Sequence, residues 1–246
     1  MSIWGKLIGG AAGFALGGPL GALLGGLAGH AFDKMRGRAG EEGSDGAAGT
    51  KQIAFTIGVI ALGAKMAKAD GRVTADEVAA FKEVFRIPPE EMNNVARVFD
   101  RARRDAGGYE PYARQIAKLF HDNPAVLEDL LDGLFHIAKA DDVIHPNEIA
   151  FLSGVAEIFG FSDAEFDRIR ASNIGADEAD PYRIIGAPHD ISDDQLKKRY
   201  RALIREHHPD RLIAEGMPAE FVEVANEKLA VINDAYDRIA KQRALN

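Results

Sequence analysis

The sequence predicts an all-α protein with three consecutive parts: a glycine-rich apolar segment, a central helical domain and a short helical domain at the carboxyl terminus. Three observations support this prediction. Apolar residues recur at helical spacing after residue 50, an acidic motif occurs twice in the middle of the chain, and a proline separates two amphipathic runs near its end. We expect no β-strands.

The composition limits the classes of function. A length of 246 residues fits one or two domains, and a hydrophobic content of 46% is sufficient for packed cores. The net charge of −8 argues against nucleic-acid binding by the molecule as a whole. There is no cysteine, which excludes disulfides, thiolate nucleophiles and cysteine-ligated zinc, and which fits a reducing compartment.

The first part, residues 1–36, is predicted to be a transmembrane segment with short flanks. No charged side chain occurs in the 23 residues from Leu7 to Gly29. As a helix they would extend about 34 Å, enough for a hydrocarbon core of about 30 Å. More basic residues follow the segment than precede it, which predicts a single pass through the inner (plasma) membrane with the soluble domains in the cytoplasm. A membrane hairpin that turns at Gly18-Pro19 is the main alternative. A cleaved signal peptide lacks a convincing cleavage site, and a flexible linker does not explain the interspersed Leu, Ile and Phe.

Glycine occupies every fourth position of this segment. In water these glycines would disfavour a helix by about 1 kcal/mol each relative to alanine, whereas in lipid the cost of unpaired backbone groups enforces one. A glycine ladder also leaves a groove where a second backbone can approach, so we expect self-association as a homodimer. The predicted contact residues are Gly9, Gly13, Gly17, Gly21, Gly25 and Gly29.

Residues 37–50 are polar and glycine-rich and are predicted to be a flexible linker. The central domain is then expected at residues 51–172. Within it, residues 66–77 recur 71 positions later as residues 137–148, which predicts two halves related by a pseudo-twofold axis. The expected helices lie at 53–69, 75–86, 90–105, 110–121, 124–140 and 147–159.

The acidic residues of this repeat have two interpretations. As oxygen donors they can ligate a divalent cation, and the candidates are Asp70, Glu77, Asp141 with its neighbour Asp142, and Glu148. However, the interval from Asp70 to Glu77 is not that of an EF-hand loop. Acidic residues at helix starts also cap free amides, as in the capping box of Thr74 and Glu77, and Pro146 suits a first helical turn. We therefore predict structural capping, with no metal and no cofactor.

A short linker at 173–179 precedes the third part, residues 180–246. Leu196, Tyr200 and Leu203 lie on one face of a predicted helix, and Pro209 must end that helix and hold His208 in an extended conformation. A second amphipathic run follows, so the chain is expected to form a helix, a tight His-Pro-Asp loop and a helix. The first helix carries the basic residues Lys197, Lys198, Arg199, Arg201 and Arg205.

This part resembles the J-domain of DnaJ-type co-chaperones. The resemblance rests on Asp180-Pro-Tyr-Arg-Ile-Ile-Gly186, on the helix from Ser192, on His208-Pro209-Asp210 and on Ile232-Asn-Asp-Ala-Tyr236. With the chain ending at Asn246, we expect three helices without the family's fourth. The resemblance implies binding to a DnaK-class chaperone and stimulation of its ATP hydrolysis, with contacts by His208, Pro209, Asp210 and the five basic residues. The residues expected in the core are Tyr182, Leu196, Tyr200, Leu229, Ile232 and Tyr236.

The repeat of the central domain resembles the TerB-like family, which is linked to tellurite resistance and the cell envelope. The order of the three parts is similar to that of the DjlA-like membrane-anchored co-chaperones. This implies a co-chaperone that is not itself an enzyme, with membrane lipid and a DnaK-class chaperone as partners and a central domain that recruits clients or signals. No G-x-S-x-G, H-E-x-x-H or Walker motif occurs. The alternative is a membrane scaffold or envelope-stress adaptor that acts mainly through the central domain and self-association.

Overall fold

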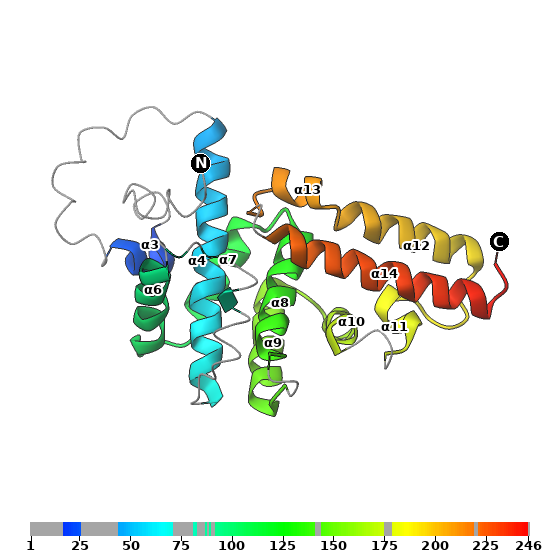
Figure 1. The fold of residues 1–246 in the computed structure, drawn as a ribbon, viewed down its shortest axis with the longest axis horizontal. Helices are drawn as coiled ribbons and strands as arrows, with labels where there is room; N and C mark the ends of the chain where they lie inside the picture. The colour runs from blue at the N-terminus through cyan, green and yellow to red at the C-terminus, as the bar shows by residue number, and fades with distance from the viewer. Residues whose placement is uncertain are drawn as a thin grey trace.

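A computed structural model describes residues 17–25, 44–70, 81–82, 87, 89, 92–140, 144–174, 179–218 and 221–245. Every regular element in these ranges is a helix, which confirms the predicted all-α class (Figure 1). The amino-terminal and central helices are α3 (Gly18–Gly25), α4 (Ser44–Asp70), α6 (Met92–Arg104), α7 (Glu110–Leu119), α8 (Pro124–Ala138), α9 (Pro146–Phe159) and α10 (Asp163–Ile174). The carboxyl-terminal helices are α11 (Pro181–Ile185), α12 (Asp193–Glu206), α13 (Pro209–Ala214) and α14 (Val222–Gln242).

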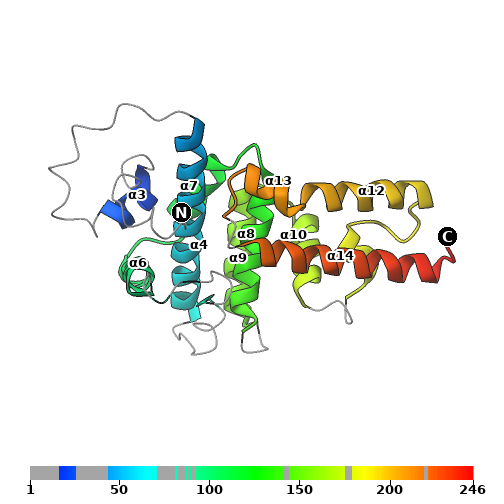
Figure 2. The ribbon, with the colours of Figure 1, turned by 45° about the horizontal axis from the view of Figure 1, so that its top comes forward.

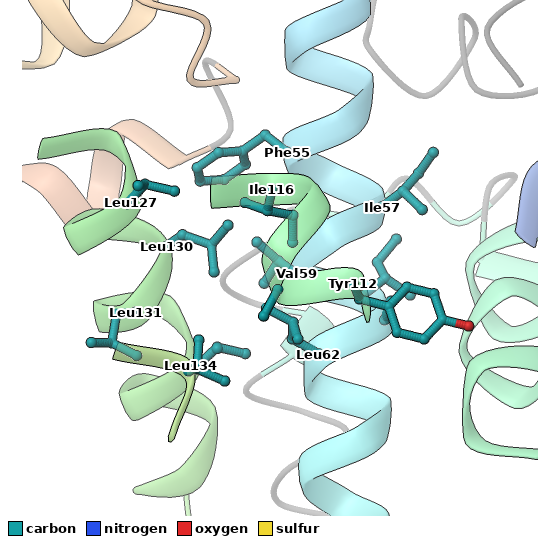
Figure 3. Packing of buried hydrophobic residues seen from close by; sticks show 14 of the residues in the cluster. Phe55, Ile57, Val59, Leu62, Tyr112, Ile116, Leu127, Leu130, Leu131 and Leu134 are labelled. Atoms are coloured by element: carbon teal, nitrogen blue, oxygen red, sulfur yellow. The ribbon is translucent and has the colours of Figure 1, made fainter. Parts of the chain in front are cut away.

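Helix α4 is the centre of the central domain and packs against α6, α7, α8 and α9 (Figure 1). Every residue from Ile53 to Ala67 is buried, and a helix that is apolar on all sides is expected where other helices surround it. Figure 3 shows side chains of α4, α7 and α8 meeting in this core, with Phe55, Ile116 and Leu130 among them. The domain is therefore organised around a single long buried helix.

The boundaries of α4 and α10 differ from the sequence prediction. Helix α4 begins at Ser44, so residues 44–50 are helical and do not belong to the predicted linker. Extending an existing helix adds one hydrogen bond for each residue that is fixed, so a polar stretch can join a helix whose later turns are buried. Helix α10 was not predicted, whereas the runs at 90–105, 110–121, 124–140 and 147–159 are confirmed to within two residues at each end.

The apolar amino-terminal segment is described at residues 17–25. Gly17 and Gly18, the first residue of α3, have φ angles of 55° and 57°, which a right-handed helix does not adopt, so a regular helix cannot continue through these two residues. The predicted uninterrupted helix over residues 7–29 is thus broken there, next to the turn expected for the hairpin alternative. Among the ladder glycines, Gly21 and Gly25 lie within α3, and Gly9, Gly13 and Gly29 lie outside the described residues.

Helix α3 packs on the central domain. Leu20 and Leu23 are buried in the main core, and Gln115 of α7 accepts a hydrogen bond from the Leu20 amide at 3.0 Å and donates one to the Gly17 carbonyl at 2.9 Å. None of the helices in the described part of the chain combines the length and the apolar character that crossing a membrane requires.

The second copy of the repeat shows the predicted capping. The carboxylate of Glu148 accepts a hydrogen bond of 2.8 Å from the backbone amide of His145, and Pro146 occupies the first turn of α9. The half-buried Ile144 packs against the main core. Residues 71–80 and 141–143 and the side chain of Asp70 lie outside the described residues, so capping at Glu77 and symmetry between the turns stay predictions. In the described part, no group of three or more acidic or histidine side chains is suited to hold a metal ion.

We expect Glu148→Ala to lower the free energy of unfolding by about 0.5–2 kcal/mol, because it leaves the amide at the start of α9 without its cap. Thermal unfolding, measured with a chelator and again with calcium or magnesium, should give the same loss. Glu157→Ala changes an exposed glutamate of the same helix and is the matched control. Stabilisation of the wild type by either cation, absent from Glu148→Ala, would instead favour the metal interpretation.

The carboxyl-terminal part is a long pair of helices, α12 and α14 (Figure 2), with α11 packed against them (Figure 1). Tyr182, Leu196 and Ile232 are buried as predicted, and the half-buried rings of Tyr200 and Tyr236 stack with centroids 4.1 Å apart. Leu229, which was also predicted to lie in the core, is half-buried but is not among the residues packed against it, and its neighbour Lys228 is buried instead. The reason is tertiary: Lys228 faces acidic residues of α8.

Candidate partner-binding site

The candidate site begins where α12 ends. Ser192 caps the start of α12 by accepting a hydrogen bond from the Gln195 amide. Because proline disfavours the helical region for the residue before it, α12 ends before Pro209. His208 is extended, with φ −68° and ψ 127°, as predicted. Pro209 then opens the six-residue helix α13, so a short helix follows where the sequence predicted only a tight loop.

His208 and Asp210 face solvent at this junction. The side chain of Asp210 is 92% exposed and that of His208 is 53% exposed, with His208 Nδ1 3.9 Å from an Asp210 carboxylate oxygen. His208 also accepts a hydrogen bond of 3.3 Å from the Asp210 amide. A hollow of about 530 Å³ lies beside them, lined also by Tyr200, Ile204 and Arg201. The backbone of Asp210 is thus held by the His208 side chain, and its carboxylate is open to a partner.

The five predicted basic residues do not all share one face. At about 100° per residue, Lys197, Lys198, Arg201 and Arg205 fall within an arc of about 100° around α12, whereas Arg199 points away from it. Arg199 donates a hydrogen bond of 3.2 Å to the carbonyl of Ile185 in α11 and thus helps to hold the domain together. Among described residues, no carboxylate lies within ion-pair distance of the other four. We call these four residues the basic face. It extends along α12 to the end of the helix, where His208 and Asp210 follow.

Arg243 connects α14 to the start of α12 at the end of this domain that is far from His208 and Asp210, and sequence analysis missed it. Its guanidinium donates to the Tyr182 hydroxyl at 2.7 Å, to the Ile191 carbonyl at 2.6 Å and to the Asp193 carboxylate at 2.9 Å. These bonds hold the start of α12 against the end of α14. A lone arginine after the last apolar position carries no periodic signal, and its partners lie about 50 to 60 positions away.

Behind the exposed site lies a buried group of ionisable side chains, which sequence analysis also missed. It joins α8 to α10, α12 and α14. Lys228 lies 2.7 Å from the Asp132 carboxylate and 3.2 Å from that of Asp129. Arg168 donates a hydrogen bond of 2.8 Å to Glu128. The members of this buried cluster are Glu128, Asp129, Asp132, Arg168, His207 and Lys228.

Electrostatic interactions within the buried cluster keep Glu128 and Lys228 charged. Desolvation alone would raise the pKa of Glu128, but the charges of Lys228 and Arg168 outweigh it and hold that pKa well below its ordinary value. Desolvation lowers the pKa of Lys228, and the carboxylates of Asp132 and Glu128 more than reverse this, so the net shift is upward. For Asp132, desolvation is the largest effect and its pKa is raised. Burial is tolerated here because each cation has carboxylate partners.

Comparisons with known proteins agree with the three-part organisation. Residues 1–44 match the model of the co-chaperone DjlA transmembrane domain, residues 56–171 that of tellurite resistance protein TerB, and residues 180–243 that of the DnaJ domain. A co-chaperone protein DjlA from Photobacterium profundum is 30% identical over 98% of this chain and 99% of its own length. Those of Escherichia coli K12 (30%, covering 99% of both chains) and Vibrio cholerae (29%, covering 100% of both) are similar throughout. No solved structure matches the chain.

Proposed function

The chain belongs to the DjlA family of J-domain co-chaperones, and from this we propose that it binds a DnaK-class chaperone and stimulates that partner's ATP hydrolysis. The observation that carries the proposal is the exposed Asp210 carboxylate at the end of the basic face. Lys197, Lys198, Arg201 and Arg205 attract an acidic surface of the partner. Their long-range attraction mainly raises the association rate and weakens with salt.

In this mechanism the chain does not hydrolyse ATP itself. The basic face orients α12 on the partner, and Asp210 then contacts a cationic group near the partner's nucleotide-binding domain. His208 supports the Asp210 backbone through the hydrogen bond to its amide, and Pro209 sets the direction in which α13 leaves α12. The stimulating contact is therefore one exposed carboxylate on a backbone whose position is fixed.

The test is single-turnover ATP hydrolysis by the host DnaK-class chaperone, with and without this chain. The expected result is acceleration that saturates with the concentration of the chain and requires more of it as salt is raised. If the wild-type chain leaves the rate unchanged at every concentration, the proposal is wrong. A membrane scaffold or envelope-stress adaptor would then be the better hypothesis.

In this proposal residues 1–36 serve as a lipid anchor in the inner membrane, with α3 released from its packing on the central domain, and the central domain recruits clients or signals. The match to the DjlA transmembrane domain and the uncharged stretch from Leu7 to Gly29 support the anchor. Lys34, Arg36 and Arg38 after this stretch favour a cytoplasmic position for the helical domains. A hairpin that turns at Gly18-Pro19 would also place the helical domains in the cytoplasm. Both of its ends would lie on one side of the membrane, and both carry basic residues, Lys6 before the stretch and Lys34 after it.

Self-association through the glycine ladder is best tested at Gly9 and Gly13. Replacing both by leucine should fill the groove and reduce the yield of crosslinked dimer in membranes, because close backbone approach drives helix association in lipid. Ala11→Leu with Ala15→Leu is the matched control, since these positions have the same spacing on another face. Equal dimer yields for the two double variants would contradict a role of the ladder.

A further inference from the structure

The exposed His208-Pro209-Asp210 segment is tied to the central domain immediately before and after it. On one side, His207 is 2% exposed, and its Nδ1 lies 3.1 Å from the Asp129 carboxylate of α8. On the other side, Leu212 of α13 is completely buried in the core of the central domain. The segment therefore presents one side to solvent while its neighbours on both sides face into the protein.

The chain between α13 and α14 strengthens this tie. Met217 and Phe221 belong to the main core, and the ring of Phe221 meets that of Phe55 edge-on with centroids 4.7 Å apart. The backbone of α8 comes close to the same ring, because a Cβ atom on Gly133 would lie 3.0 Å from it. Apolar contacts thus connect this chain segment to both α4 and α8.

Lys228 adds a polar tie from α14. It is the point at which the longest helix of the carboxyl-terminal domain contacts Asp129 and Asp132 of α8. Asp132 also accepts a hydrogen bond of 2.7 Å from Asn173 of α10. Since α14 packs against α12 through Tyr200 and Tyr236, the contact of Lys228 with α8 fixes the orientation of both helices relative to the central domain.

We infer that the central domain is the positioning element for the stimulating contact, and that Lys228 is a positioning residue that holds Asp210 in place through the buried cluster. This inference rests on the proposed function and deepens it. A DnaK-class partner would meet a composite unit of the two helical domains rather than an independent carboxyl-terminal module. A contact made by one carboxylate depends steeply on position, since a displacement of about 1 Å can cost about a hundredfold in rate.

The test uses the full chain with Lys228→Met and Asp132→Asn combined. The double change removes the tie but leaves the formal charge of the buried cluster unchanged, and the amide introduced by Asp132→Asn retains an oxygen that can accept from Asn173. Lys228→Met alone is the second variant. Lys241→Met is the matched control, because it removes the same charge from an exposed position of the same helix. Thermal unfolding must show that each variant is folded at the assay temperature.

Two measurements are made on each variant. The first is stimulated single-turnover ATP hydrolysis, separated into the maximal rate and the half-saturating concentration. The second is the distance distribution between spin labels at Lys118→Cys and Ala214→Cys, exposed positions of α7 and α13. The chain has no cysteine of its own to interfere with labelling.

The expected result for the double variant is a maximal rate that falls about tenfold, with a broadened label distribution. The half-saturating concentration should change little, because the basic face is intact. A merely stabilising role of Lys228 would lower the unfolding temperature but leave the maximal rate unchanged in the folded protein. The inference is overturned if the double variant keeps the wild-type maximal rate, or if the rate falls while the distribution stays narrow. If the wild type itself does not stimulate, the proposed function has failed.

Discussion

Asp210→Asn is expected to abolish stimulation of the DnaK-class partner without changing the unfolding temperature of the chain. The side chain of Asp210 is 92% exposed, and its carboxylate has only His208, at 3.9 Å, as an ion-pair neighbour among the described residues. The folded state therefore loses almost nothing, whereas the complex loses a charged contact. Losing one partner of a buried charge pair at an interface costs about 2–5 kcal/mol, which corresponds to a factor of about 30 or more.

Two further variants make this result specific. Asp194→Asn neutralises another exposed aspartate at the start of a helix in the same domain, and it should stimulate as well as the wild type. His208→Gln should reduce stimulation, because it changes the side chain whose Nδ1 holds the Asp210 amide. Normal stimulation by Asp210→Asn would show that the partner does not use this carboxylate, and the co-chaperone mechanism proposed here would have to be abandoned.

Glu128→Gln is expected to have the largest effect on stability among the substitutions considered. The carboxylate is buried and pairs with Arg168, and it is one of three carboxylates around Lys228. Removing one partner of a buried ion pair leaves the remaining charge uncompensated and costs about 3–5 kcal/mol. Chemical unfolding at neutral pH measures this loss. Glu157→Gln, which changes an exposed glutamate of α9, is the control and should change the unfolding free energy little.

The pH dependence of the unfolding free energy provides a second test of the role of the Glu128 charge. Desolvation opposes ionisation, but Lys228, Arg168 and His207 together hold its pKa well below the ordinary value of 4.5. The stability contributed by the ionised carboxylate is therefore fully present above the pKa of the unfolded chain and is lost as the pH falls toward the lower pKa of the folded chain. The difference in unfolding free energy between the wild type and Glu128→Gln should be largest at neutral pH and should decrease progressively below pH 4.5. A difference that stays constant across that range would mean that packing, not charge, accounts for the loss.

The exposed half of the site was predictable from sequence because its determinants are local. The extended conformation of His208 follows from Pro209, and four of the five basic residues fall on one side of α12 by helical spacing alone. The exception, Arg199, shows the limit of this approach: its bond to the Ile185 carbonyl depends on how α11 packs against α12. The amino-terminal helix was misjudged for a related reason, since a run of apolar residues cannot show that Gly17 and Gly18 adopt positive φ.

The sequence by itself determined the all-α class, most helix boundaries of the central domain and the place of the His-Pro-Asp segment, because periodicity, capping and proline geometry act over a few residues. Only the tertiary structure decided that His207, Phe221 and Lys228 face the central domain. The hydrogen bonds from His207 and Lys228 to Asp129 span 78 and 99 positions in the chain. Burial of a lysine is stable only where the fold brings opposite charges to it, and a buried histidine needs a hydrogen-bond partner; both requirements are met by helix packing, which no local pattern encodes.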